Sequence, residues 1–348
     1  MKKISTLIAL LFITAVTGLY AQKIGDFKPK DDSFKAKKLN EGTKKLYIAN
    51  FGINFEIYKE AIDEKKAGGF GRSVKNAAKA KAAAGLSTLE KEALQAEADK
   101  LFTEFVNGME SKGYEIISAG EAGKTATYDG WEMMTGPNIG ETDMTGILSI
   151  VPTGYSFYYK ERNAFSNQMA GFQKTSQNLS QELDDALIAD ISLIYAFSEI
   201  GDDWNVSNQA KVKLNINYRL ASNYTFSDED TKTSLSSLVD KSKQSVALSS
   251  QVIFTRGKLP VGGSAEAQYV GAMKSDLEIS GVLEKDKVVA FSTQTQATAS
   301  LQNPIVVIRG DNYSEKTKWL EPNGKKYAEG MYLAGSKFIN YHVGEVFK

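Results

Sequence analysis

One hydrophobic pattern, in residues 186–220, constrains the fold of this chain more than any other feature. From Ala210 to Leu220 every second residue is apolar, and the residues between are polar or charged. Successive side chains of a strand point to opposite faces, so this segment predicts a strand with one buried and one solvent-facing side. Residues 186–197 are apolar on nearly both sides and predict a more central strand. The turn formers of residues 199–208 lie between them, which indicates a long antiparallel hairpin.

The amino-terminal residues have the pattern of an export signal. Lys2 and Lys3 precede an apolar run at residues 4–19, which is followed by Ala21. The alternative is a membrane anchor, but the run is shorter than the ~20 residues that span a bilayer. We therefore expect a signal peptide at residues 1–21 and no transmembrane helix in the mature chain. The expected location is the periplasm, the outer membrane as an associated protein, or the medium.

Composition excludes several classes of site. The 348 residues include no cysteine, which excludes disulfides, thiolate metal ligands, a cysteine nucleophile and a lipid-modified cysteine after the signal peptide. Basic and acidic residues balance at 42 each, so no net field attracts nucleic acid or an anionic membrane. We expect no nucleic-acid partner.

The order of segments predicts one large folded unit. Residues 22–43 are polar and lysine-rich and are expected to be a flexible lead-in. Residues 44–348 are expected to form a single elaborated α/β domain; the alternative is a division into an α/β part at 44–235 and a β-rich part at 245–348. Residues 45–58 predict its first strand, with a bend or bulge at Gly52.

A long helix is predicted next. Ser87 and Glu90 have capping-box spacing, and apolar residues then recur at helical spacing, so the helix is expected from about residue 88 to 112. Residues 114–118 predict a short strand, which completes a βαβ-type unit. The basic, alanine-rich residues 72–84 are expected to be a solvated helix or flexible insertion; the alternative is a surface patch for phosphate or anionic lipid.

The later segments add strands and a second hairpin. Strands are predicted at residues 246–255, 277–283, 288–295 and 304–309, with a hairpin around residues 284–287, and residues 163–183 suit a helix. Residues 319–348 are mixed, with a turn at 322–324. The fold class is therefore α+β with an α/β-like amino-terminal part: a long helix packed on a mixed, largely antiparallel sheet, with additional carboxyl-terminal β-hairpins.

Catalytic signatures are weak. His342 is the single histidine, so a histidine metal cluster is excluded, and it is interpreted as an ordinary strand residue. Residues 118–125 nearly match a phosphate-binding loop but have Ser118 where the motif needs glycine, so a plain surface loop is favoured. Asp143 lies in a turn similar to that of aspartic proteases, without a second copy.

Acidic residues leave one enzymatic hypothesis open. Carboxylates cluster at residues 184–185, 202–203 and 228–230, where we expect solvated loops. Asp190, on a largely apolar strand, is expected to be hydrogen-bonded structure. We expect no cofactor and no metal. The hairpin tip is a candidate partner contact, with these residues: Asp202, Asp203, Trp204 and Asn205.

The order of elements resembles the exported α/β domain of the curli-secretion CsgG family and of the TolB amino-terminal domain. Residues 46–51, 89–109, 113–117, 189–194 and 211–220 carry the resemblance. It implies a binding or assembly module and transfers no catalytic residue. The missing lipid-anchor cysteine departs from the secretion-channel members.

Three functional hypotheses follow. The first is a non-enzymatic envelope protein that binds a protein partner or assembles with itself. The second is an exported hydrolase that acts on glycans or peptides through carboxylates. The third is an oligomeric outer-membrane secretion or pore component whose hairpins insert on oligomerisation.

Overall fold

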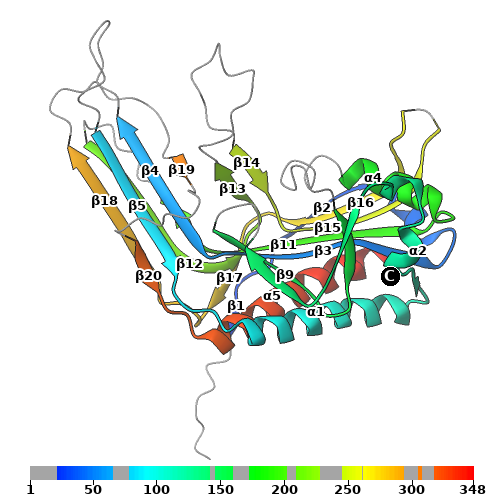
Figure 1. Ribbon diagram of the computed structural model, residues 1–348, viewed down its shortest axis with the longest axis horizontal. Helices are drawn as coiled ribbons and strands as arrows, with labels where there is room; N and C mark the ends of the chain where they lie inside the picture. The colour runs from blue at the N-terminus through cyan, green and yellow to red at the C-terminus, as the bar shows by residue number, and fades with distance from the viewer. Residues whose placement is uncertain are drawn as a thin grey trace, which may run out of the picture.

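The computed structural model describes residues 22–65, 78–141, 146–159, 172–201, 209–227, 245–260, 262–293, 305–307 and 317–348. Its architecture is α+β, as predicted: two long helices lie side by side under one face of a largely antiparallel sheet (Figure 1). The expected signal peptide lies outside the described residues.

The main sheet has twelve strands among the described residues, and its principal path runs β1-β17-β12-β11-β15-β16-β2. Its strands are β1 (Lys23–Ile24), β2 (Pro29–Phe34), β3 (Lys45–Glu56), β6 (Glu115–Ile116), β8 (Asn138–Glu141), β9 (Ile147–Val151), β11 (Leu187–Ile200), β12 (Gln209–Leu220), β15 (Gln251–Lys258), β16 (Ala265–Met273), β17 (Leu277–Ser280) and β18 (Asp286–Thr293).

The predicted hairpin forms the centre of this sheet. β11 and β12 pair antiparallel, and β11 is buried along most of its length. Along its other edge β11 pairs parallel with β3, and its amino-terminal half also pairs antiparallel with β15. The nearly continuous apolar sequence of β11 follows from this position, because strands and layers surround it on all sides.

Smaller sheets and ribbons pack around the main sheet. β4 (Tyr58–Lys65), β5 (Ala78–Leu86), β19 (Ile305–Val307) and β20 (Lys318–Leu320) form a four-stranded sheet. β4 and β5 pack across β12 and β18 in a two-layered extension at the left of Figure 1. Two ribbons consist of β7 (Glu132–Thr135) with β10 (Ser156–Tyr159) and of β13 (Tyr224–Ser227) with β14 (Ser245–Leu248).

The largest core lies between the main sheet and the helices α1 (Lys91–Ser111) and α5 (Gly324–Val346). The opposite face of the sheet is covered at one end by α2 (Ala119–Ala122), η2 (Ala126–Tyr128) and α4 (Phe172–Glu182), and at the other by the β13–β14 ribbon. Strand residues of the two faces alternate between these cores, as the period of two requires.

The predicted helix and βαβ-type unit are confirmed, but not the capping box. α1 buries Leu94, Leu101 and Phe105 at helical spacing, and β6 pairs parallel with β3. Ser87 does not cap the helix; its hydroxyl donates to a carbonyl of β20, while Glu90 takes the N-cap position without a side-chain bond. The tertiary contact with β20 therefore replaces the local one.

Two segments that composition marked as loosely held contain strands. The expected flexible lead-in, residues 22–43, contains β1, β2 and the short helix η1 (Ala36–Asn40), with Leu39 fully buried. Of the basic segment at 72–84, residues 78–84 belong to β5 and not to a helix, and residues 72–77 lie outside the described residues. Ala80, Ala82 and Ala84 of β5 are buried, and pairing with β4 overrides the helix propensity of alanine.

The expected hairpin around residues 284–287 is not formed. β17 and β18 both pair antiparallel with the same strand, β12, one after the other, and not with each other. The segment between them is a loop that interrupts one continuous edge.

The carboxyl-terminal residues form α5, where the sequence indicated a mixed segment. Asn323 is its N-cap and accepts a hydrogen bond from the amide of Lys326 at 3.2 Å. A Cβ at Gly335 would lie 2.7 Å from the Tyr195 hydroxyl and 2.8 Å from Leu101, so glycine lets this helix approach β11 and α1 closely. His342 is therefore a buried helix residue and not a strand residue.

Candidate functional site

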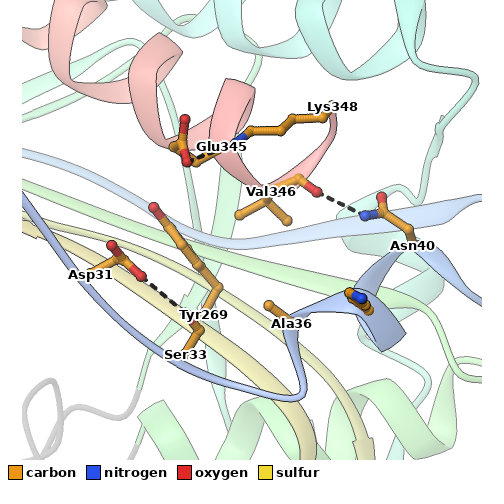
Figure 2. A pocket seen from close by; sticks show the side chains of 9 residues that line it. Asp31, Ser33, Ala36, Asn40, Tyr269, Glu345, Val346 and Lys348 are labelled. Atoms are coloured by element: carbon orange, nitrogen blue, oxygen red, sulfur yellow. Dashed lines mark hydrogen bonds and ion pairs between the residues drawn. The ribbon is translucent and has the colours of Figure 1, made fainter.

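A cleft of ≈ 420 Å³ lies where β2 and η1 pass beside the carboxyl end of α5 (Figure 2). β16 forms its floor. The residues that line it carry charges of both signs around one phenol: Asp31, Ser33, Ala36, Lys37, Asn40, Tyr269, Glu345, Val346 and Lys348.

Strand register brings the cleft residues together. β2 is paired with β16 so that Ser33 lies opposite Tyr269 and Asp31 opposite Gly271. Residues opposite each other share a face of the sheet, so these side chains point toward α5. Lys35 adopts the left-handed conformation (φ 51°), which turns the chain from β2 into η1. Residues of both elements therefore line the cleft.

The end of α5 is fixed to η1. The Asn40 amide donates to the Val346 carbonyl at 2.7 Å, and Lys112 Nζ donates to the Phe347 carbonyl at 2.6 Å (Figure 2 shows the first). The last carbonyls of a helix lack partners within the helix, so both contacts satisfy groups that would otherwise need water.

Tyr269 and His342 form a buried pair beneath the cleft. The hydroxyl of Tyr269 lies 2.7 Å from His342 Nδ1, and His342 Nε2 lies 3.2 Å from the Ala272 carbonyl. A carbonyl only accepts hydrogen bonds, so Nε2 carries the hydrogen, and Nδ1 of the neutral ring accepts from the tyrosine. A Cβ at Gly271 would lie 2.4 Å from the imidazole, so the ring depends on glycine for its place.

Burial keeps both members of the pair uncharged. It lowers the pKa of His342 to about 4, against the smaller opposing effects of the Ala272 carbonyl and of the charges of Asp31 and Glu345. Burial, reinforced by the same two carboxylates, raises the pKa of Tyr269. Both nitrogens of the imidazole are thus hydrogen-bonded. The protonated phenol of Tyr269 lies at the nearly buried floor of the cleft.

The charged groups of the cleft lie toward solvent. Asp31 accepts a hydrogen bond from Ser33 at 3.0 Å, and Glu345 forms an ion pair with Lys348 at 3.1 Å. Lys37 lies on the exposed side of η1. Exposed pairs of this kind are weak and exchange readily for a partner's charges.

The buried carboxylate of Glu56 is used by the scaffold. It accepts hydrogen bonds from the backbone amides of Phe197 and Ser198 at 3.0 and 2.9 Å, and from Tyr224 at 2.9 Å. Lys59 Nζ lies 3.0 Å away. The carboxylate thus satisfies two amides of β11 just beyond the end of the β3–β11 ladder, and these donors together with Lys59 compensate for its complete burial.

A second ionic contact supports the same region. Arg219 Nε donates to Asp276 at 2.6 Å, and its Nη2 donates to the Ser198 carbonyl at 2.9 Å. Asp276 also accepts from the amide of Ser222 at 2.7 Å. Because Arg219 is buried, its guanidinium needs hydrogen-bond acceptors within the protein, and these two groups supply them.

Asp190 is hydrogen-bonded structure, as expected. Its carboxyl accepts from the Asn50 amide at 2.9 Å across the β3–β11 ladder. Burial raises the pKa of this carboxyl to about 6, while the hydrogen bond from Asn50 opposes the shift. Among the described residues no charged group contributes to the shift, so desolvation is its cause.

The predicted contact residues Asp202, Asp203, Trp204 and Asn205 lie outside the described residues, as do Asp143 and residues 228–230. The remaining acidic cluster does not converge on a site. Asp184 pairs with Lys45 and Asp185 with Arg256, each at 3.5 Å.

The near-match to a phosphate-binding loop is a structural turn. Ser118 Oγ accepts the amide of Glu121 at 3.2 Å and so caps the four-residue helix α2. Within the described ranges, no three side chains of the metal-ligating types gather closely enough to hold a metal ion. Neither α1 nor α5, nor any other described helix, combines the length and the apolarity needed to cross a membrane.

Sequence reasoning singled out His342 and Asp190 but missed the cleft itself. The only available signals were the alternation along β16 and the charged residues near both ends of the chain, and neither shows that these segments meet. No protein-family model, curated protein or solved structure matches the chain. The resemblance to the CsgG and TolB domains stays a prediction.

Proposed function

We propose that this chain is an exported envelope protein without enzymatic activity, which binds a protein partner or assembles with itself. The observation that carries the proposal is the cleft: charges of both signs surround a phenol whose hydroxyl is already bound to His342. An apolar floor ringed by charged side chains of both signs suits a peptide segment with charged side chains.

The proposed site engages a partner through its exposed charged groups. Glu345 can release Lys348 and bind a cationic side chain of the partner, while Lys37 binds an acidic one. The Tyr269 ring, which is almost fully buried, forms the floor of the cleft between them. Because the Asn40–Val346 bond fixes the cleft before binding, little ordering cost arises.

Charge reversal in the cleft tests this proposal. The tagged mature protein is used to isolate partners from envelope extract, and binding of the isolated partner is then measured. Glu345→Lys should weaken that binding at least about tenfold, as expected for a like-charge contact. Glu329→Lys, on an exposed position of the same helix outside the cleft, is the matched control and should bind normally. Equal binding by both variants would reject the cleft as the site.

One observation favours a second candidate, the carboxylate hydrolase. Asp31 and Glu345 are two carboxylates that line one cleft, which is what such an enzyme requires. The mature protein is assayed on cell-wall glycan and on peptide. Hydrolysis that disappears in both Asp31→Asn and Glu345→Gln would establish this candidate and displace the first.

A further inference from the structure

The outer edge of β18 has no strand partner among the residues that the structure describes. One edge of β18 pairs with β12 from Asp286 to Thr293. In an antiparallel strand the backbone groups of alternate residues point away from the paired neighbour. The other edge therefore presents a row of unpaired N–H and C=O groups, which is a template for strand addition.

The opposite end of the same sheet is protected against such pairing. β2 is also an edge strand, but it begins with Pro29 and carries Lys30, Asp31 and Asp32. Proline and charges are the usual means by which edge strands avoid pairing. β18 has uncharged residues at its centre, of which Val288, Val289 and Ala290 are half-buried.

The charge pattern of β18 suits pairing with a second copy of the same strand. If a second β18 adds antiparallel about a two-fold axis at Val289, Lys287 lies opposite Phe291 and Asp286 opposite Ser292. No like charges meet. The same operation at either central residue of β2, Asp31 or Asp32, places that aspartate opposite its own copy, which is destabilising. The charge pattern is therefore compatible with a second copy of this chain at the β18 edge and opposes one at the β2 edge.

We propose that β18 is the docking site for a second copy of this chain, which adds antiparallel and continues the main sheet across a two-fold axis. This inference rests on the self-assembling form of the proposed function. Strand addition uses backbone hydrogen bonds, and a two-fold axis closes the assembly at a dimer because each copy uses its one β18 edge.

The orientation of Val289 makes the edge testable without damage to the core. Val289 pairs with Lys213, whose side chain is half-exposed, while its neighbours Val288 and Ala290 pair with the buried residues Leu214 and Val212. A charge at position 289 therefore faces away from the core and toward the second copy's residue 289.

Light scattering over a concentration series measures the first consequence. The wild-type mature protein should form dimers, and Val289→Lys should raise the dimer dissociation constant at least about tenfold, since two like charges would face each other at the axis. Val289→Thr keeps the β-propensity without the charge and should dimerise nearly as well. Equal thermal stability of the two variants verifies that the lysine does not act through unfolding.

Cysteine cross-linking measures the geometry, because the natural chain contains no cysteine. Under mild oxidation Val289→Cys should give a disulfide-linked dimer, and Asp32→Cys at the centre of β2 should not. A wild-type protein that stays monomeric at all concentrations overturns the inference. So does a dimer that neither cross-links at position 289 nor responds to Val289→Lys, but that result leaves the proposed self-assembly intact. Partner isolation tests the cleft independently.

Discussion

Replacing Asp190 with Asn should make the protein lose stability faster on acidification, even though it removes an acid. The reason is that Asp190 and His342 have opposite effects on stability between pH 7 and pH 5. His342 has a pKa of about 4 in the folded protein, below its ordinary 6.5, so the unfolded chain binds a proton first and stability falls with pH. Asp190 has a folded pKa of about 6, above its ordinary 3.8, so the folded protein binds a proton first and stability rises as pH falls.

The two contributions partly cancel. With these pKa values, acidification from pH 7 to pH 5 costs about 2 kcal/mol of unfolding free energy through His342 and restores about 1 kcal/mol through Asp190. The wild-type protein should therefore lose less than about 1 kcal/mol from this pair. Asp190→Asn should lose about 2 kcal/mol, and His342→Gln should gain about 1 kcal/mol.

Urea unfolding at a series of pH values measures these slopes. Asparagine can accept the same hydrogen bond from Asn50, and glutamine can donate to and accept from the partners of His342, so both variants retain the local contacts. The other titrating groups are shared by all three proteins, and their effects cancel in the differences between variants. If Asp190→Asn follows the wild-type pH dependence, the carboxyl of Asp190 is not held protonated by burial and the reasoning fails.

Two further predictions concern packing and buried charge. Glu56→Gln should lower the free energy of unfolding by about 3–5 kcal/mol, because it leaves Lys59 buried without its carboxylate; adding Lys59→Met should recover much of the loss in chemical denaturation. Gly271→Ala should cost about 1–3 kcal/mol, because the new Cβ meets His342 at 2.4 Å. The matched change Gly344→Ala in α5, where a Cβ meets nothing within 4 Å, should instead stabilise the protein by about 0.5–1 kcal/mol in the same assay.

Sequence reasoning succeeded where the side-chain period is unambiguous. The strict alternation of residues 210–220 predicted β12, and the helical spacing of Leu94, Leu101 and Phe105 predicted α1. It failed where local preference and tertiary partner disagree. Alanine and lysine favour helix, yet β5 is a strand because β4 supplies its hydrogen bonds and buries its alanines.

Helix α5 and the cleft show what a single sequence withholds. α5 contains glycines such as Gly330 and Gly335, which lower helix propensity but serve close packing against the sheet. The cleft combines a segment at residues 31–40 with Tyr269 and the end of the chain. Only the register of β2 on β16 and the cap between Asn40 and Val346 bring these parts together, and neither contact leaves a local pattern in the sequence.

Site-specific photo-cross-linking tests the central claim, that the cleft binds a protein partner, most directly. The cysteine-free chain allows a single photoreactive label at Ser33→Cys, in the cleft, and a control label at Glu329→Cys, on the exposed side of α5. In envelope extract we expect a discrete cross-linked species, containing either another protein or a second copy of this chain, from the cleft label and not from the control. The same yield from both labels, or none from the cleft label, would contradict the claim that the cleft is the binding site.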